Sequence, residues 1–138
     1  MKTGILRSIT LLLCTVLALA VTAARPGAKT NVSFNELSHD FGNISASIPS
    51  VSTTFEITNN GDAAVAILSA KASCGCTEPD YQRKPIMPGE TGTVKVTFLT
   101  RGYSGEFDKE VTVRLRSASG KSERVQFVIK GVIIPPTQ

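Results

Sequence analysis

The sequence predicts an all-β fold, an antiparallel β-sandwich of immunoglobulin-like type with about seven strands. Apolar and polar residues alternate along several short segments, which is the period of a half-buried strand, and the clearest runs are 51–58, 93–98 and 111–116. Turn-forming Gly, Pro and Asn residues separate these segments every ten or so residues, as is typical of β-sandwiches. Beyond the N-terminal apolar run, no apolar repeat at helical spacing occurs. The chain has no Trp and its two central cysteines lie close together in sequence, so it lacks the Trp and the inter-sheet disulfide of antibody domains.

Seven segments have the composition of strands, and the residues between them are typical of turns. We expect the strands at 31–34, 39–44, 51–58, 63–70, 93–98, 107–116 and 125–131. The segment 59–62 (NNGD) predicts a tight hairpin, and 87–90 (MPGE) predicts a type II turn because a Gly follows a Pro. Residues 79–87 are expected to form a long connection, and 101–105 a hairpin-like loop with two glycines.

The N-terminal residues have the pattern of a secretory signal peptide. Lys2 and Arg7 precede an apolar run, and small residues follow it, so we expect cleavage after Ala23, with Ala20 as the alternative. Cys14 lies within the apolar run, without the small preceding residue of a lipid-attachment site, and is expected to leave with the signal. The predicted organisation is a signal peptide at 1–23, a flexible leader at 24–30 and one sandwich domain at 31–138. We therefore expect an exported protein, periplasmic or secreted, with no membrane span after cleavage.

The charge of the chain excludes an obvious polyanion-binding tract. Loss of Lys2 and Arg7 reduces the basic residues from 15 to 13 against 11 acidic residues, which lowers the net charge from +4 to +2. The remaining basic residues are dispersed among acids along the sequence, and no run of them is present. Since phosphate binding needs clustered positive charge, we expect no nucleic-acid partner.

The segment Ser73-Cys74-Gly75-Cys76-Thr77 is the one motif with obvious chemistry. In an oxidising compartment Cys74 and Cys76 are candidates for a disulfide across one residue, which requires a turn that Gly75 is suited to supply. As thiolates, they are instead candidate ligands of Cu(I) or Zn²⁺, although two ligands are too few for a closed zinc site. A third hypothesis is thiol exchange with a partner disulfide.

Two further side chains are candidate metal ligands. Met87 offers a thioether for a copper site with Cys74 and Cys76, although its place before Pro88 also suits an apolar contact under a turn. His39 is the one histidine in the chain, and beside Asp40 it is a candidate ligand or base, although a structural hydrogen bond is the more usual role. A hydrolytic site would need a nucleophile, a histidine and an orienting acid in a recognisable pattern, which the sequence does not show. We assign no catalytic and no cofactor-binding residue.

Four motifs occur here in the order found in one known family. They are 39–44 (HDFGNI), 57–61 (ITNNG), 73–77 (SCGCT) and the segment from 86–90 (IMPGE) through Phe98. The chain resembles the exported domains of unknown function common in Bacteroidota, which are similar to Hydin-type immunoglobulin-like domains. The resemblance covers nearly the whole mature chain and implies an immunoglobulin-like sandwich in the cell envelope. It implies no activity.

The predicted function is therefore that of a non-catalytic envelope module that binds another protein or a polysaccharide. The expected contact surfaces are loops at one end of the sandwich, including 74–83 and 101–105, because loops at the end of a rigid scaffold commonly carry binding sites. The alternative is thiol redox chemistry or copper or zinc handling through Cys74 and Cys76.

Overall fold

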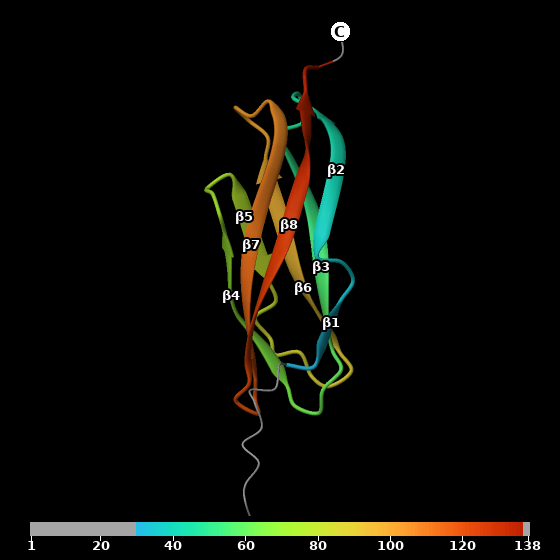
Figure 1. Cartoon of the computed structure of the whole chain (residues 1–138), viewed down its shortest axis with the longest axis vertical. Coiled ribbons are helices and arrows are strands. Elements are labelled where there is room, and N and C mark those ends of the chain that lie inside the picture. Colours follow the sequence, from blue (N-terminus) through green and yellow to red (C-terminus); the bar gives the residue numbers. More distant parts are fainter. Residues whose placement is uncertain (1–29, 137–138) are drawn as a thin grey trace, which may run out of the picture.

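A computed structural model of the chain describes residues 30–136, which form eight strands in two packed sheets (Figure 1). The strands are β1 (Val32–Phe34), β2 (Ser38–Ser45), β3 (Ser50–Asn59), β4 (Val65–Ala72), β5 (Thr77–Tyr81), β6 (Thr91–Leu99), β7 (Gly105–Ser117) and β8 (Ser122–Ile134). The expected all-β immunoglobulin-like sandwich is confirmed, with eight strands in place of about seven.

Each sheet contains four strands. The first has the order β1-β3-β6-β5 and the second the order β2-β8-β7-β4. The second sheet lies in front in Figure 1. All pairings are antiparallel except that of β2 with β8, which run in the same direction, so the sheet is mixed where a purely antiparallel one was expected. The register of this parallel pair shifts between Asp40 and Asn43.

The core lies between the sheets and follows from the alternation seen in the sequence. In β8, for example, Val125, Phe127, Ile129 and Gly131 are all buried, as expected for alternate residues of a half-buried strand. Phe127 stacks on Phe55 of β3 at a centroid distance of 4.3 Å, which joins the two sheets. Burial of each large apolar side chain contributes about 1.5–3 kcal/mol, so this core supplies the main stabilisation of the fold.

The extra strand is β5, which the sequence places at the start of a long connection. It pairs with β6 at the edge of its sheet, with Pro79 opposite Val96. Proline removes a backbone donor, and edge strands tolerate this loss because one side of the strand has no partner. Because Pro79 and the charged residues around it interrupt the apolar–polar alternation, the sequence does not indicate this strand.

The segment 59–62 does not form the predicted hairpin, because β3 and β4 belong to different sheets. Asn59 is fully buried at this crossing. Its Nδ2 donates to the carbonyl oxygens of Ala63 and Ile86, both at 2.9 Å, and its Oδ1 accepts from the amide of Gly61 at 2.9 Å. The side chain therefore supplies the hydrogen bonds that a hairpin would have made between backbone groups. Residues 101–105 likewise connect two sheets, since β6 and β7 are in different ones.

The turn at 87–90 is confirmed. The amide of Glu90 donates to the carbonyl of Met87 at 2.9 Å, and Gly89 has φ +81°, the value that the third position of a type II turn requires.

Thr30, the last residue of the predicted leader, packs against the sandwich. Thr30 is buried, and its hydroxyl donates to the Glu123 carboxylate. The predicted signal peptide at 1–23 and the rest of the leader lie outside the described residues. Among residues 30–136, no helix is long and apolar enough to cross a membrane.

Candidate functional site at the bridged end of the sandwich

The Cys-Gly-Cys segment forms the crossing from β4 to β5, and therefore from one sheet to the other. The amide of Ser73 donates to the carbonyl of Glu110 on β7, at 2.9 Å, before the chain leaves the sheet β2-β8-β7-β4. The carbonyl of Cys76 accepts from the amide of Leu99, at 2.8 Å, where the chain joins the sheet β1-β3-β6-β5. The loop is thus hydrogen-bonded to both layers, near the upper end of the molecule in Figure 1.

Cys74 and Cys76 are joined by a disulfide across Gly75, with their Cα atoms 5.3 Å apart. This separation lies within the usual range for disulfides. Cys76 is 8% exposed and belongs to the core, whereas Cys74 is half-buried at its margin. The hydroxyl of Thr77 lies 3.6 Å from the sulfur of Cys74 and 3.8 Å from that of Cys76, so one hydroxyl faces both sulfurs. The turn closes with the amide of Thr77 donating to the carbonyl of Cys74 at 3.3 Å.

Gly75 does not have the role expected of it. Its φ is not positive, and a Cβ added there would meet no atom within 4 Å, so the turn does not need the backbone freedom of glycine. The absence of a side chain has a different effect. Gly75 lines an open hollow beside the disulfide, and any side chain at this position would project into that space.

This hollow has a volume of about 560 Å³ and is formed by three loops that are far apart in the sequence. Pro49 comes from the β2–β3 connection and Ser50 from the start of β3. Gly75 and Cys76 come from the β4–β5 connection, and Leu99, Arg101 and Tyr103 from the end of β6 and the β6–β7 loop. Apolar groups make up most of its lining, and Arg101 is the one charged residue. We call this feature the bridged hollow.

Hydrogen bonds through Thr100, which is 2% exposed, connect two of these loops. Its hydroxyl donates to the carbonyl of Ile48, and its amide donates to the carbonyl of Pro49 at 3.1 Å. Tyr103 packs on Phe98 with ring centroids 5.3 Å apart, and 38% of its surface remains exposed. The bridged hollow is therefore formed by loops that the core holds in place.

The predicted contact loops meet only in part. Gly75 and Cys76 from the segment 74–83 line the same hollow as Arg101 and Tyr103 from the segment 101–105. Arg83 lies beyond the far end of β5, where its guanidinium stacks on Tyr81 at 4.1 Å.

Met87 and the cysteines do not come together. Met87 lies in the turn before β6, whereas the carbonyl of Cys76 accepts a hydrogen bond from the amide of Leu99 at the other end of that strand. Eight residue steps of about 3.3 Å separate Thr91 from Leu99, so the two positions are roughly 26 Å apart. The structure therefore rules out a shared copper site of Cys74, Cys76 and Met87.

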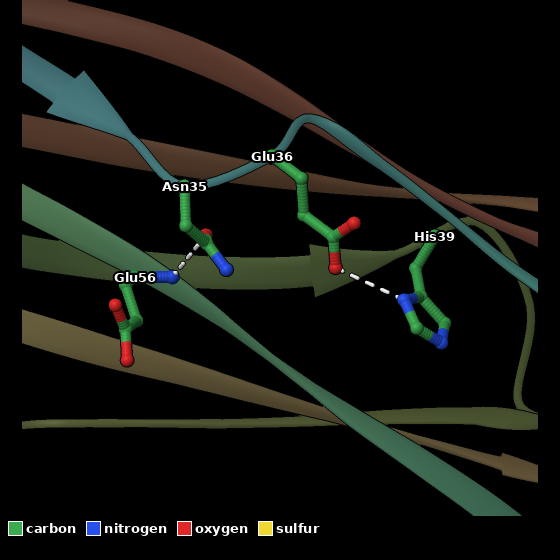
Figure 2. A network of polar contacts seen from close by, with 4 residues as sticks. All are labelled: Asn35, Glu36, His39 and Glu56. Carbon is green, nitrogen blue, oxygen red and sulfur yellow. Dashed lines mark hydrogen bonds and ion pairs between the residues drawn. The ribbon is translucent and has the colours of Figure 1, made fainter.

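His39 lies on β2, at the opposite edge of its sheet from β4. Three inter-strand spacings of about 4.8 Å place it roughly 14 Å from the cysteine loop. Its Nδ1 lies 3.0 Å from Oε1 of Glu36, and Figure 2 shows these two side chains pointing toward each other. The imidazole also packs against Phe41 at 4.7 Å, so its contacts are structural. Within residues 30–136, no three His, Cys, Asp or Glu residues form a group that could hold a metal ion.

Sequence reasoning did not find Pro49, Ser50, Leu99 or Thr100. Strand alternation shows which face of a strand a residue occupies, but it does not show which loops meet at the end of the sandwich. One signal in the sequence could have found Thr100. It is a polar residue at the next inward-facing position after the buried residues of β6.

Comparison with known proteins gives one family and a set of shared folds. A family model described as "Protein of unknown function (DUF1573)" matches residues 32–133. No curated protein matches the chain in sequence.

Several solved structures share the sandwich at low sequence identity. PapD-like domain 7 of human CEP192 is 16% identical with a TM-score of 0.64, and the match covers 86% of this chain and 95% of that domain. The periplasmic chaperone SfaE is 11% identical with a TM-score of 0.58, covering 78% of this chain and 59% of the chaperone. The VesB protease of Vibrio cholerae is 17% identical with a TM-score of 0.61 over 73% of this chain, but this chain matches only 31% of its length. These likenesses establish the fold alone.

Proposed function

Because the chain belongs to the DUF1573 family of proteins of unknown function, we propose from its structure that it is a non-catalytic binding module of the cell envelope. The observation that supports this proposal is the bridged hollow, a concave and mostly apolar surface formed by loops on a rigid sandwich. Loops held by such a scaffold are the usual site of recognition in sandwich folds.

The lining of the hollow favours a protein partner. Tyr103 and Arg101 are of the residue types that most often dominate protein–protein interfaces, and both line the hollow and are exposed. Ile48, which is 42% exposed, extends the apolar surface from the neighbouring loop. We infer that an apolar or aromatic side chain of an extended segment of another envelope protein occupies the hollow.

The location of the protein in the envelope rests on its signal-like N-terminus. Cell fractionation of a C-terminally tagged chain, followed by N-terminal sequencing, tests this part. We expect the protein in the periplasm or the medium, with a mature N-terminus after Ala23. A cytoplasmic protein with its N-terminal segment intact would contradict it.

Site-specific photocrosslinking tests the hollow itself. A photoreactive phenylalanine analogue at position 103 should give one discrete protein adduct in cells, and the same analogue at Lys95, an exposed residue on β6, should not. Gly75→Leu should reduce the yield from position 103, because its side chain projects into the hollow. Equal adducts from both positions, or an unchanged yield in Gly75→Leu, would contradict the proposal.

A second candidate function is thiol exchange at the disulfide, which is favoured by the position of the bridge beside the open hollow. A thiolate of a partner dithiol would attack the sulfur of Cys74, the more exposed of the two. The Cys74–Cys76 bond would break, and the sulfur of Cys76 would leave with the electron pair. The second thiol of the partner would then displace Cys74, so that the partner becomes a disulfide and this chain a dithiol.

Trapping experiments separate this candidate from a purely structural bridge. In Cys76→Ser, Cys74 is a free thiol that should attack the disulfide form of the partner, the reverse of the exchange above, and stay in a mixed disulfide because Cys76 is absent to complete the exchange. Cys74→Ser leaves only the buried Cys76 and should trap little. Equal trapping by both variants, or by neither, would contradict the exchange hypothesis. The metal-handling version requires prior reduction, because both sulfurs are bonded to each other.

A further inference from the structure

A basic surface lies on the outer face of the sheet β2-β8-β7-β4, away from the bridged hollow. Arg114 and Arg116 of β7, Arg124 of β8 and Lys71 of β4 share this face, and we call these four residues the basic patch. Strand pairing brings them together from separate parts of the sequence. Their apparent dispersal along the chain therefore does not describe the surface.

The central feature of the patch is a direct cross-strand pair of like charges. Arg114 lies opposite Arg124 in the β7–β8 register, so the two side chains leave the same face of the sheet as immediate neighbours. Side chains opposite each other in an antiparallel pair have Cβ atoms about 5 Å apart, and like charges at this spacing repel. Lys71 is opposite Thr112, the next outward residue of β7, and adds a third charge on a diagonal.

Among residues 30–136, none of the four basic side chains forms an ion pair with a carboxylate. The two ion pairs among residues 30–136 are His39–Glu36 and Lys130–Asp40. All 11 Asp and Glu residues of the chain fall within this range, so no acidic side chain elsewhere in the sequence is available. Glu110 borders the patch, where its carboxylate accepts from Nε2 of Gln126 at 3.3 Å.

A hollow of about 350 Å³ lies over this part of the sheet. Its lining combines Lys71, Arg114 and Arg124 with the hydroxyl-bearing Ser69 and Thr112, and Glu110 is the one acidic residue that also lines it. Guanidinium groups present paired donors that match the two oxygens of a carboxylate, sulfate or phosphate group. The hollow thus offers charged and neutral donors to an oxyanion.

The composition of the patch restricts the class of ligand. It contains no aromatic side chain, whereas protein interfaces depend on aromatic anchors and single-stranded nucleic acids stack on aromatic rings. The other half of the same sheet face carries Asp40, Glu106 and Asp108, which line a separate hollow. A planar anionic membrane would meet these acids together with the basic patch, whereas a narrow linear polymer can cross the basic half alone.

We propose that the basic patch binds an acidic polysaccharide through its carboxylate, sulfate or phosphate groups. This ligand would neutralise the Arg114–Arg124 pair, and its neighbouring charged groups would reach Arg116 and Lys71. The site goes beyond the proposed function, because it lies on a different face from the bridged hollow, and only its setting in the envelope rests on the predicted export.

Binding of dextran sulfate to the purified protein tests this proposal, with uncharged dextran of the same length as the matched ligand. We expect binding of dextran sulfate alone, weakening steeply as salt is raised from about 50 to 200 mM, as for other polyanions. Arg114→Gln/Arg124→Gln should lose affinity by about tenfold or more, because charge-assisted hydrogen bonds are lost. Lys84→Gln/Lys95→Gln removes the same charge from exposed positions elsewhere and should bind within about twofold of the unaltered protein.

Several results would overturn the proposal. These are no binding of dextran sulfate at low salt, equal binding of uncharged dextran, or equal losses in the two double variants. Tighter binding of a single-stranded oligonucleotide than of dextran sulfate would assign the patch to nucleic acid. A dimer in sedimentation that Arg114→Gln/Arg124→Gln dissociates would assign it to a second copy of the chain. None of these results bears on the bridged hollow, which the crosslinking at position 103 tests separately.

Discussion

At two glycines of this chain, the room available for a side chain determines the effect of a substitution, and the conformational freedom of the backbone does not. A Cβ added at Gly75 would meet nothing within 4 Å, whereas one added at Gly92 would fall 2.6 Å from Cγ1 of the buried Ile86. The same substitution is therefore expected to have opposite effects at the two positions.

We predict that Gly75→Ala stabilises the protein by up to about 1 kcal/mol, because it lowers the entropy of the unfolded chain at a position whose backbone any residue can adopt. Gly92→Ala should destabilise by about 1–3 kcal/mol, because the core must shift to admit the methyl group. Urea unfolding of the two variants measures both effects. A loss of stability in Gly75→Ala would show that the bridged turn depends on glycine after all.

Asn59 is the buried polar residue on which the β3–β4 crossing depends. We predict that Asn59→Ala costs about 1–3 kcal/mol for each partner left unpaired, since the carbonyl of Ala63 loses its donor and the amide of Gly61 its acceptor. The carbonyl of Ile86 keeps the hydrogen bond from the amide of Val65. Asn60→Ala is the control, because its side chain bonds to Ser33 at the surface and its loss should cost little. Thermal unfolding distinguishes the two, and equal effects would contradict the role assigned to Asn59.

At the scale of the strands, the pairing of β7 with β8 places two positive charges side by side. We predict that Arg124→Gln raises the free energy of unfolding by about 0.2–1 kcal/mol at low salt, because it removes the repulsion from Arg114. The gain should shrink as salt screens the pair. Arg116→Gln is the control, since Arg116 lies opposite the uncharged Ser122. A destabilised Arg124→Gln would mean that the arginine makes a favourable contact in the free protein.

The strands themselves were largely predictable, and their partners were not. Alternation placed Val125, Phe127 and Ile129 on one face, and the structure buries all three. It missed β5, because Pro79 and the charges around it suit an edge strand and a loop equally well. Alternation also could not show that the chain changes sheet after Asn59, the last residue of β3, since the turn residues of hairpins and of crossings between sheets are similar.

The candidate sites were predictable only where they are local. The bridged turn lies within five consecutive residues and was recognised from them. The hollow beside it combines residues near 49, 75 and 101, and the basic patch combines Lys71 with residues of β7 and β8. Both depend on sheet order and register, which hydrophobic periodicity leaves open.

At the scale of the whole molecule, the core and the disulfide contribute very unequally to stability. A bridge that encloses a single residue removes little entropy from the unfolded chain, under about 2 kcal/mol in the loop-closure model. Phe127, by contrast, is fully buried and contacts aromatic rings from both Phe55 and Phe34. Truncation of such a residue to Ala costs about 3–5 kcal/mol.

We therefore predict that reduction of the Cys74–Cys76 bond leaves the protein folded and lowers its melting temperature less than Phe127→Ala does. Circular dichroism with and without a dithiol reductant, with alkylation and mass spectrometry to confirm two free thiols, measures the effect. Unfolding on reduction would make the bridge a structural requirement and would argue against thiol exchange, because a module that exchanges its disulfide must keep its fold in both states. A folded, reduced protein would leave the two sulfurs available for that chemistry at the margin of the bridged hollow.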